Sequence, residues 1–306
     1  MFDTEKAKKI LTTRIEGVRI KLVNPVNEMK DLEKLRNFGA EVEIVERGEP
    51  AIILAKDDIK ITYKATPVQI EFEPFLRTLL RLARGERELP LGDCEGEIVV
   101  FIAPVCPHCA QVVENVNRIA ISNPKIRVTV VDVALYPDLG EMYQVSSVPT
   151  VVIGENVKLV GEYTLEEVVE WVKRVLCLKN YKLEYYIMLL ENGRIDEVKQ
   201  DVEKDEKNLI TLAEIIERPE LLARVGAMIV LENVFKKDPK KIRNAKLRIL
   251  EILKKNNPTA VQDAIYILGK LGSKSDLPYL RKFLNSKDEN IREAAEEAIE
   301  EIEKRF

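Results

Sequence analysis

Two kinds of hydrophobic pattern alternate along residues 91–178 of this 306-residue chain. Short runs rich in β-branched residues are typical of buried strands, and the stretches between them place apolar residues at the spacing of an amphipathic helix. The order of these stretches is β-α-β-α-β-β-α, which predicts an α/β unit. The expected strands are residues 98–103, 126–133, 150–153 and 158–161, and the expected helices are residues 111–121, 139–143 and 165–176.

Residues 1–90 carry a looser version of the same order. The sequence Glu-Pro-Ala-Ile-Ile-Leu at 49–54 is similar to Val-Pro-Thr-Val-Val-Ile at 148–153, and a further strand follows each of them. This similarity indicates a weak internal repeat. The expected strands are residues 18–23, 41–45, 49–54 and 58–63, and the expected helices are residues 29–38 and 72–83.

The last third of the chain, residues 179–306, has apolar residues only at helical spacing, in short segments joined by turns. The clearest segments are 259–271, 277–284 and 291–302. The stretch Ala-Ile-Tyr-Ile-Leu-Gly-Lys-Leu-Gly at 264–272 resembles HEAT-type repeats. That resemblance implies helical pairs that stack into a solenoid and bind other proteins. An unrelated helical bundle is the alternative.

The composition is that of a folded protein in water, with 46% hydrophobic and 33% charged residues. A net charge of −4 gives no general attraction to nucleic acid or membranes. Nine basic residues between Lys236 and Lys255 are interpreted as a solvated helix face. No signal-peptide core and no apolar stretch long enough for a membrane span occur, so we expect a cytoplasmic protein. The abundance of Glu, Lys, Arg, Ile and Val is a bias associated with thermophiles.

The candidate chemistry lies in Cys106-Pro107-His108-Cys109, which contains the only histidine of the chain. This Cys-x-x-Cys joins a predicted strand to a predicted helix. A helix N-terminus has unpaired N–H groups and a positive dipole end, which stabilise a thiolate over a thiol. The placement favours a reactive dithiol over a zinc site, for which the sequence offers few further ligands, and over a structural pair of buried thiols. We therefore expect neither a metal nor a cofactor.

This order of elements, with Cys-x-x-Cys opening the first helix, resembles the thioredoxin fold. Pro149 stands directly before the strand 150–153, 40 residues after Cys109. In thioredoxin-fold proteins such a proline is cis and faces the dithiol, so the resemblance implies that Val148 and Pro149 bind the extended chain of a substrate. Val105 and Val100 stand where thioredoxins have a tryptophan and a buried aspartate. We therefore do not expect a general thioredoxin-like reductant.

Residues 1–178 resemble more specifically the protein disulfide oxidoreductases, glutaredoxin-like proteins with two tandem thioredoxin folds. The stretch Phe-Ile-Ala-Pro-Val-Cys-Pro-His-Cys at 101–109 carries most of the resemblance, with the strand 59–63 and the helix 72–82 in support. This chain departs from that family in two ways: Asn-Pro-Val-Asn at 24–27 replaces the first Cys-x-x-Cys, and a helical third is added. The resemblance therefore implies one working redox centre.

We predict that Cys106, the cysteine nearer to solvent, attacks a substrate disulfide and that Cys109 resolves the mixed disulfide. Pro107 and His108 are expected to tune the redox potential of the pair. A charge or an N–H group of His108 would stabilise the Cys106 thiolate and make the pair a stronger oxidant.

The predicted function is thus a thiol–disulfide oxidoreductase acting on protein clients, with the helical repeats binding a client or partner. One alternative is a HEAT-like interaction scaffold with a redox-sensitive thioredoxin module. Another is a redox partner of a thiol peroxidase or flavoprotein, because bacterial alkyl hydroperoxide reductase systems contain tandem thioredoxin folds with one inactive site. The expected domains are residues 1–90, 91–178 and 179–306. Cys94 and Cys177 are expected to be unpaired thiols, with a structural disulfide as the alternative.

Overall fold

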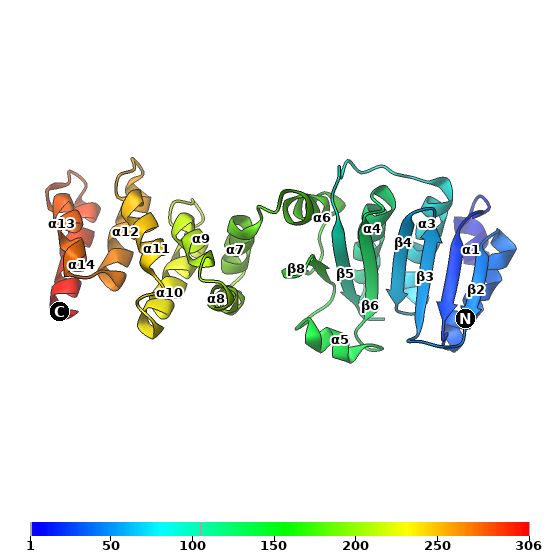
Figure 1. Ribbon diagram of the computed structural model, residues 1–306. Helices are drawn as coiled ribbons and strands as arrows, with labels where there is room; N and C mark the ends of the chain where they lie inside the picture. The colour runs from blue at the N-terminus through cyan, green and yellow to red at the C-terminus, as the bar shows by residue number, and fades with distance from the viewer. Residues whose placement is uncertain (1, 105, 306) are drawn as a thin grey trace. The chain divides into compact units, whose positions relative to one another are not determined.

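The computed structural model describes residues 2–104 and 106–305. The chain forms two compact units, residues 1–180 and residues 181–306, which we call the α/β unit and the helical unit. Every strand of the described chain lies in the α/β unit (Figure 1). The predicted fold class, a thioredoxin-like α/β part followed by an all-helical part, is confirmed.

One eight-stranded sheet runs through the α/β unit in the order β2-β1-β3-β4-β6-β5-β7-β8. It consists of a first half-sheet, β2-β1-β3-β4, and a second half-sheet, β6-β5-β7-β8, with the same sequence of parallel and antiparallel pairs. The half-sheets join where β4 pairs with β6 in parallel. The predicted internal repeat is therefore present in the structure. The strands are β1 Arg19–Val23, β2 Glu41–Val45, β3 Ala51–Lys56, β4 Ile59–Lys64, β5 Gly96–Ile102, β6 Ile126–Asp132, β7 Thr150–Ile153 and β8 Val157–Val160.

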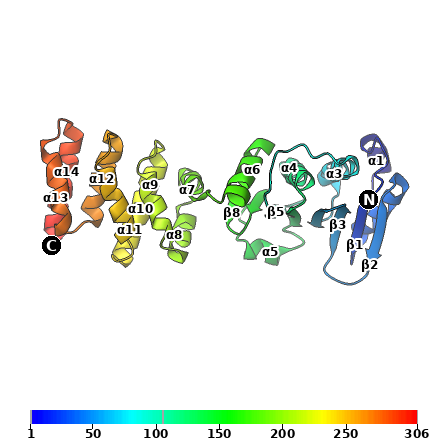
Figure 2. The ribbon, with the colours of Figure 1, turned by 45° about the horizontal axis from the view of Figure 1, so that its top comes forward.

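Helices cover the two faces of this sheet unequally. Four helices, α1, α3, α4 and α6, lie in a row over one face (Figure 2). On the opposite face the short helix α5 covers the second half-sheet, where Leu139 and Tyr143 pack on a buried cluster of Phe101, Val131 and Val152. The helices are α1 Thr4–Ile10, α2 Asn27–Lys30, α3 Phe72–Arg84, α4 Cys109–Ser122, α5 Pro137–Met142 and α6 Leu165–Val172.

Two of the predicted helices differ in type from the expectation. Residues 29–38 fall in α2 and a 3-10 helix, Asp31–Phe38. Their buried side chains Met29, Leu32 and Leu35 recur every three residues, which suits the three residues per turn of a 3-10 helix. The predicted helix 165–176 is α6 followed by a π-helix, Lys173–Leu178.

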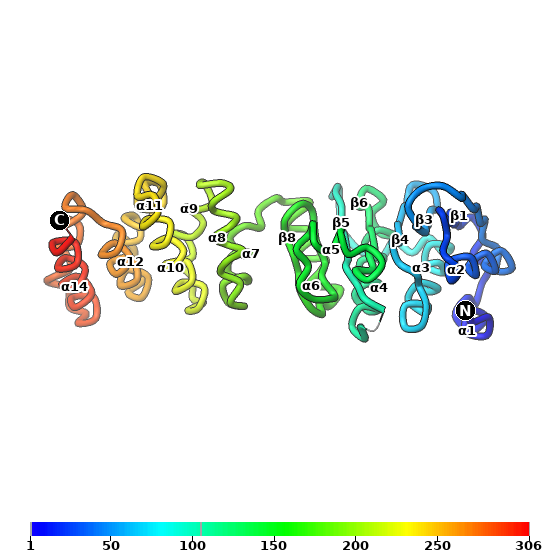
Figure 3. The backbone as a smooth tube through the Cα atoms, turned by 90° about the horizontal axis from the view of Figure 1, so that it is seen from below, coloured from blue at the N-terminus to red at the C-terminus, as the bar shows by residue number. Residues whose placement is uncertain are grey.

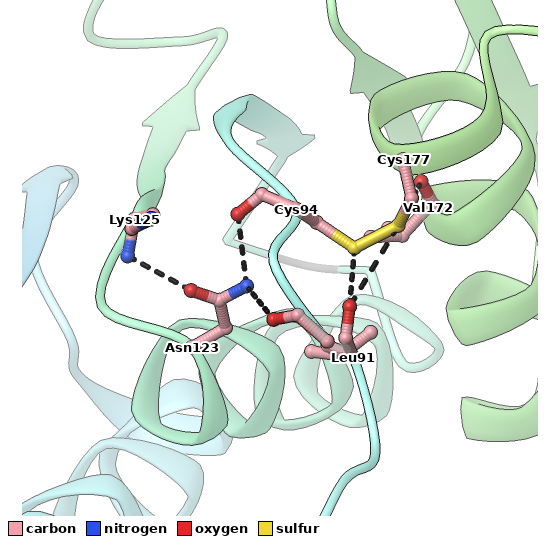
Figure 4. The surroundings of a disulfide bond; sticks show 7 residues. Leu91, Cys94, Asn123, Lys125, Val172 and Cys177 are labelled. Atoms are coloured by element: carbon pink, nitrogen blue, oxygen red, sulfur yellow. Dashed lines mark hydrogen bonds between the residues drawn. A yellow bond between two sulfur atoms is a disulfide. The ribbon is translucent and has the colours of Figure 1, made fainter.

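The expectation that Cys94 and Cys177 are unpaired thiols is wrong, because the two residues form a disulfide (Figure 4). Cys94 lies just before β5, and the π-helix returns the chain to the start of that strand. There the side chain of Leu176 packs so closely on Gly96 that a Cβ atom on residue 96 would lie 2.7 Å from it. This packing brings the cysteine Cα atoms to 4.6 Å, within the range for a disulfide.

The helical unit contains two layers of packed helices. In the first layer α10 contacts α7 and α12, and α12 contacts α14; the second layer includes α9 and α11 (Figure 3). The HEAT-like segments 259–271, 277–284 and 291–302 are helical, the middle one as a short α-helix followed by a 3-10 turn. The helices are α7 Lys182–Glu191, α8 Ile195–Lys204, α9 Asn208–Ile215, α10 Leu221–Lys237, α11 Arg243–Ile252, α12 Pro258–Leu271, α13 Leu277–Leu280 and α14 Glu289–Arg305.

The basic segment between Lys236 and Lys255 is largely neutralised within the helical unit. Six of its nine cations form ion pairs with acidic side chains of this unit, and they are Lys236, Lys237, Lys241, Lys246, Arg248 and Lys255. Among the described residues, no helix has the length and apolar character needed to cross a membrane.

Replacing Cys94 and Cys177 together by alanine is expected to lower the free energy of unfolding of the α/β unit by about 4 kcal/mol. The bond joins residues separated by 83 positions, so its loss gives the unfolded chain more freedom. Urea unfolding followed by the fluorescence of Trp171, the only tryptophan, reports on this unit. The matched control replaces Cys106 and Cys109, which close a short loop and are expected to contribute about half as much. Equal urea midpoints for wild type and the first variant would contradict the prediction.

Candidate active site

The predicted redox pair lies between the end of β5 and the start of α4. Cys106 and Cys109 form a disulfide, with their Cα atoms 5.4 Å apart. A tight turn holds them together: the Cys106 N–H donates to the Ala103 carbonyl at 3.1 Å, and the Cys109 N–H donates to the Cys106 carbonyl at 3.3 Å. Val105, where thioredoxins have tryptophan, lies outside the described residues. The short connection between strand and helix thus places both sulfurs at the first turn of α4.

The two cysteines differ in accessibility. Cys106 is 8% exposed, whereas Cys109 is fully buried. The N-cap residue of α4 is His108, and its side chain makes no capping hydrogen bond. The Cys109 N–H is used in the turn, so the next N–H groups of this 14-residue helix, those of Ala110 and Gln111, are the ones available to stabilise negative charge on a nearby sulfur. This arrangement suits Cys106 as the attacking thiolate and Cys109 as the resolving thiol.

The peptide bond between Val148 and Pro149 is cis, as predicted. Thr150 pairs with Phe101 in the antiparallel β7–β5 ladder, which puts Pro149 beside the C-terminal end of β5, where the Cys-x-x-Cys turn begins. The Pro149 carbonyl accepts a hydrogen bond from the Gly161 N–H at 2.9 Å. Within the described part of the chain, the backbone N–H and carbonyl of Val148 have no hydrogen-bond partner. They are free to pair with an extended chain.

His108 is connected to the loop that follows β8. Its Nδ1 atom lies 2.7 Å from a carboxylate oxygen of Glu162, and both side chains are more than half exposed. When the imidazole is protonated, this contact is an ion pair. Pro107 is exposed in the turn beside it. The imidazole is thereby held at the helix start by a partner that the sequence alone did not indicate.

A buried carboxyl group, which we did not predict, lies at the same edge of the sheet. Glu71 precedes α3 and is only 4% exposed, and neither carboxyl oxygen has a hydrogen-bond partner among the described residues. Burial raises the pKa of Glu71 to about 7, and the negative charge of Asp132 adds to this effect. Burial also raises the pKa of Asp132, the last residue of β6, which lies opposite Ile102 of β5. Two neighbouring carboxyl groups thus lie at the C-terminal end of β6.

The sequence did contain a signal for Glu71. One helix face carries, in succession, Glu71, Phe75, Thr78 and Leu82, and the last three of these are buried. An acidic residue that continues a buried stripe of this kind is expected to be buried with it.

The first half-sheet has an equivalent edge without thiol chemistry. Asn24, in the turn after β1, has a left-handed backbone conformation, and α2 begins three residues later. Pro50 precedes β3 as Pro149 precedes β7, but among the described residues only the Val148–Pro149 bond is cis. The Pro50 carbonyl accepts a hydrogen bond from the hydroxyl of Tyr136, a residue of the second repeat. The turn before β3 is therefore tied to the second repeat by this side-chain hydrogen bond.

Residues 96–173 match the thioredoxin domain family. The chain is 33% identical over 81 residues to a thioredoxin of Methanocaldococcus jannaschii, an alignment that covers 26% of this chain and 95% of the thioredoxin.

Two further similarities cover longer parts of the chain. Over 149 residues the chain is 26% identical to an alkyl hydroperoxide reductase component of Pseudomonas putida, an alignment that covers 46% of this chain but only 29% of that protein. A protein disulfide oxidoreductase from Aeropyrum pernix superposes with a TM-score of 0.46 at 17% identity, over 56% of this chain and 91% of that one.

Among the described residues, no cluster of three or more His, Cys, Asp or Glu side chains is arranged to hold a metal ion.

Replacing Glu71 by glutamine is expected to increase stability at alkaline pH and to have little effect at acid pH. The pKa of Glu71 is about 7 in the folded protein against an ordinary value of 4.5, so folding favours the protonated form. The wild type therefore loses stability as the pH rises from 4.5 through 7, by about 3 kcal/mol. The difference in free energy of unfolding between variant and wild type, followed at Trp171, should grow by this amount between pH 5 and pH 8.

Glu73→Gln is the matched control, two residues further along. A hydrogen bond from Arg77 lowers the pKa of Glu73 below its ordinary value, so this control should not gain stability with rising pH. If the stability difference between Glu71→Gln and wild type were constant from pH 5 to pH 8, the buried carboxyl group would not titrate as described.

Proposed function

The chain belongs to the thioredoxin family, and we propose that it is a thiol–disulfide oxidoreductase that exchanges disulfides with protein clients through Cys106 and Cys109. The observation that carries this proposal is the position of the cysteine pair at the start of α4, with Cys106 alone reaching the surface beside the cis-proline. A free backbone at Val148 supports a client that binds in extended form.

In the reducing direction the Cys106 thiolate attacks one sulfur of a client disulfide. A mixed disulfide forms, and the other client sulfur leaves as a thiolate that takes a proton from water. Cys109 then loses its proton and attacks the Cys106 sulfur, which releases the second client thiolate. The client gains two electrons and the protein ends with the Cys106–Cys109 disulfide. The same steps in reverse donate a disulfide to a reduced client.

The resolving step needs a group that accepts the proton of Cys109. Cys109 is fully buried, so bulk water does not reach its sulfur. The Glu71 carboxyl group, with its pKa raised to about 7, is suited to take up and return a proton near neutral pH. In this proposal the first repeat, which has no cysteine pair, contributes an acid–base group to the site of the second.

The imidazole of His108 is proposed to set the direction of exchange. A protonated imidazole near Cys106 stabilises the thiolate, which favours the reduced protein and makes the disulfide a stronger oxidant. Pro107 holds the turn between the two cysteines.

We also propose that the helical unit binds the client or a partner. Residues 1–90, 91–178 and 179–306 act as three domains in this proposal, and the protein works in the cytoplasm.

A second candidate function is transfer of electrons to a peroxide-reducing partner. The similarity to the alkyl hydroperoxide reductase component favours it, because that similarity covers 46% of the chain and so extends beyond the second repeat. The chemistry at Cys106 and Cys109 would be the same, and only the client would differ.

Replacing Cys109 by serine is expected to stop the reaction at the mixed disulfide, because no resolving thiolate remains. Electrophoresis without reductant should then show client proteins bound to Cys106, and their identification by mass spectrometry separates the two candidates. Peroxide-reducing enzymes among the trapped proteins would favour the second candidate. The control, Cys106→Ser with Cys109→Ser, should trap nothing and should not reduce insulin. Insulin reduction by that control at the wild-type rate would refute both candidates.

Replacing His108 by alanine is expected to raise the pKa of Cys106 and to make the reduction potential more negative by some tens of mV. Thiolate absorbance at 240 nm gives the pKa, and equilibration with glutathione buffers gives the potential. Replacing the exposed His108 leaves the buried contacts of the pair in place, so folding is not expected to obscure the result. An unchanged potential would mean that His108 does not tune the pair.

A further inference from the structure

A groove of about 460 Å³ crosses three helices of the helical unit, α10, α12 and α14. These helices belong to the same layer, since α12 contacts both α10 and α14. Apolar and acidic side chains from all three helices line this groove.

The floor of the groove exposes apolar side chains. Val225, Ile229 and Tyr266 are 40%, 43% and 47% exposed, and Leu221 and Leu222 extend the apolar surface along α10 at 60% each. Other large apolar residues of the described chain are exposed singly or in pairs, whereas these five gather on two neighbouring helices. A contiguous apolar surface of this kind is a mark of a protein-binding site.

The rim of the groove is negative. Four carboxylates line it, and no lysine or arginine does so in the described structure. Asp263 is paired with Arg224 at 2.7 Å, and Glu232 is paired with Lys236 at 2.6 Å. Glu293 and Glu297 have no cationic partner among the described residues. Two like charges four residues apart slightly destabilise an isolated helix, and a cation bound between them would relieve this repulsion.

We propose that this groove binds a basic amphipathic segment of a client protein. Apolar side chains of the segment pack on Val225, Ile229 and Tyr266, and its lysine or arginine side chains pair with Glu293 and Glu297. That the segment belongs to a client of the cysteine pair rests on the proposed function; the binding itself does not. A second copy of this chain is a poorer occupant, because six of the nine cations in its own basic segment are already paired.

The test uses the full chain and two fluorescein-labelled 14-residue peptides with leucines at helical spacing. One peptide has lysine at the remaining positions and the other has glutamate. Fluorescence anisotropy should show binding of the lysine peptide that is at least tenfold tighter than that of the glutamate peptide. Glu293→Lys with Glu297→Lys should weaken lysine-peptide binding at least tenfold, and Ile229→Ser should weaken it as well.

The matched control is Glu296→Lys with Glu300→Lys, which changes the charge of the same helix equally at exposed positions outside the groove. It should change the affinity less than twofold. Equal weakening by both double variants, or equal affinity for the two peptides, would overturn the proposal. Sedimentation would also overturn the proposal if it showed that the wild type is a dimer and that the Glu293→Lys/Glu297→Lys variant is a monomer. The occupant of the groove would then be a second copy of the chain.

Insulin reduction separates this inference from the function on which its client role rests. If wild type binds the lysine peptide but does not reduce insulin, the groove stands and the oxidoreductase proposal fails. If insulin is reduced but the peptide does not bind, the groove proposal fails alone.

Discussion

The parallel pairing of β4 with β6 determines how the α/β unit is built. It joins two four-stranded repeats into one sheet and satisfies the backbone groups of two strands that would otherwise be exposed edges. Because β4, β6 and β5 run in the same direction, their C-terminal ends meet at one edge. The turn after β5 carries the cysteine pair, and the segment after β4 carries Glu71. Glu71, a residue of the first repeat, is thereby brought close to Asp132 of the second.

Local patterns were sufficient to predict much of this arrangement. Runs of β-branched residues marked the strands, and the Cys-x-x-Cys between a strand and a helix marked the redox pair. The resemblance to the thioredoxin fold, rather than the local pattern, implied the cis bond before Pro149. The features that the sequence did not reveal depend on contacts between distant segments. Cys94 meets Cys177, 83 residues further along the chain, where Leu176 packs on Gly96, and the buried Glu71 lies near Asp132 of the other repeat.

The chain contains two disulfides in contrasting surroundings. The Cys94–Cys177 bond links the start of β5 to the end of the π-helix, and Cys94 is fully buried. The Cys106–Cys109 bond lies at a helix N-terminus, with Cys106 slightly accessible to solvent. Backbone N–H groups and the helix dipole stabilise a thiolate at the Cys106–Cys109 pair, whereas burial disfavours a charged sulfur at Cys94. Position in the fold therefore separates a structural bond from a reactive one within the same repeat.

The first repeat has lost its thiols but keeps functions that explain its retention. Its last strand completes the sheet beside β6, and the side chains of Tyr63, Thr78 and Asn117 form a buried hydrogen-bonded network between the repeats. Removing this repeat would expose that network and the edge of β6, and would remove the Glu71 carboxyl group. A single thioredoxin-like repeat cut from the eight-stranded sheet would therefore lack both the support of its neighbour and the buried carboxyl group beside Asp132.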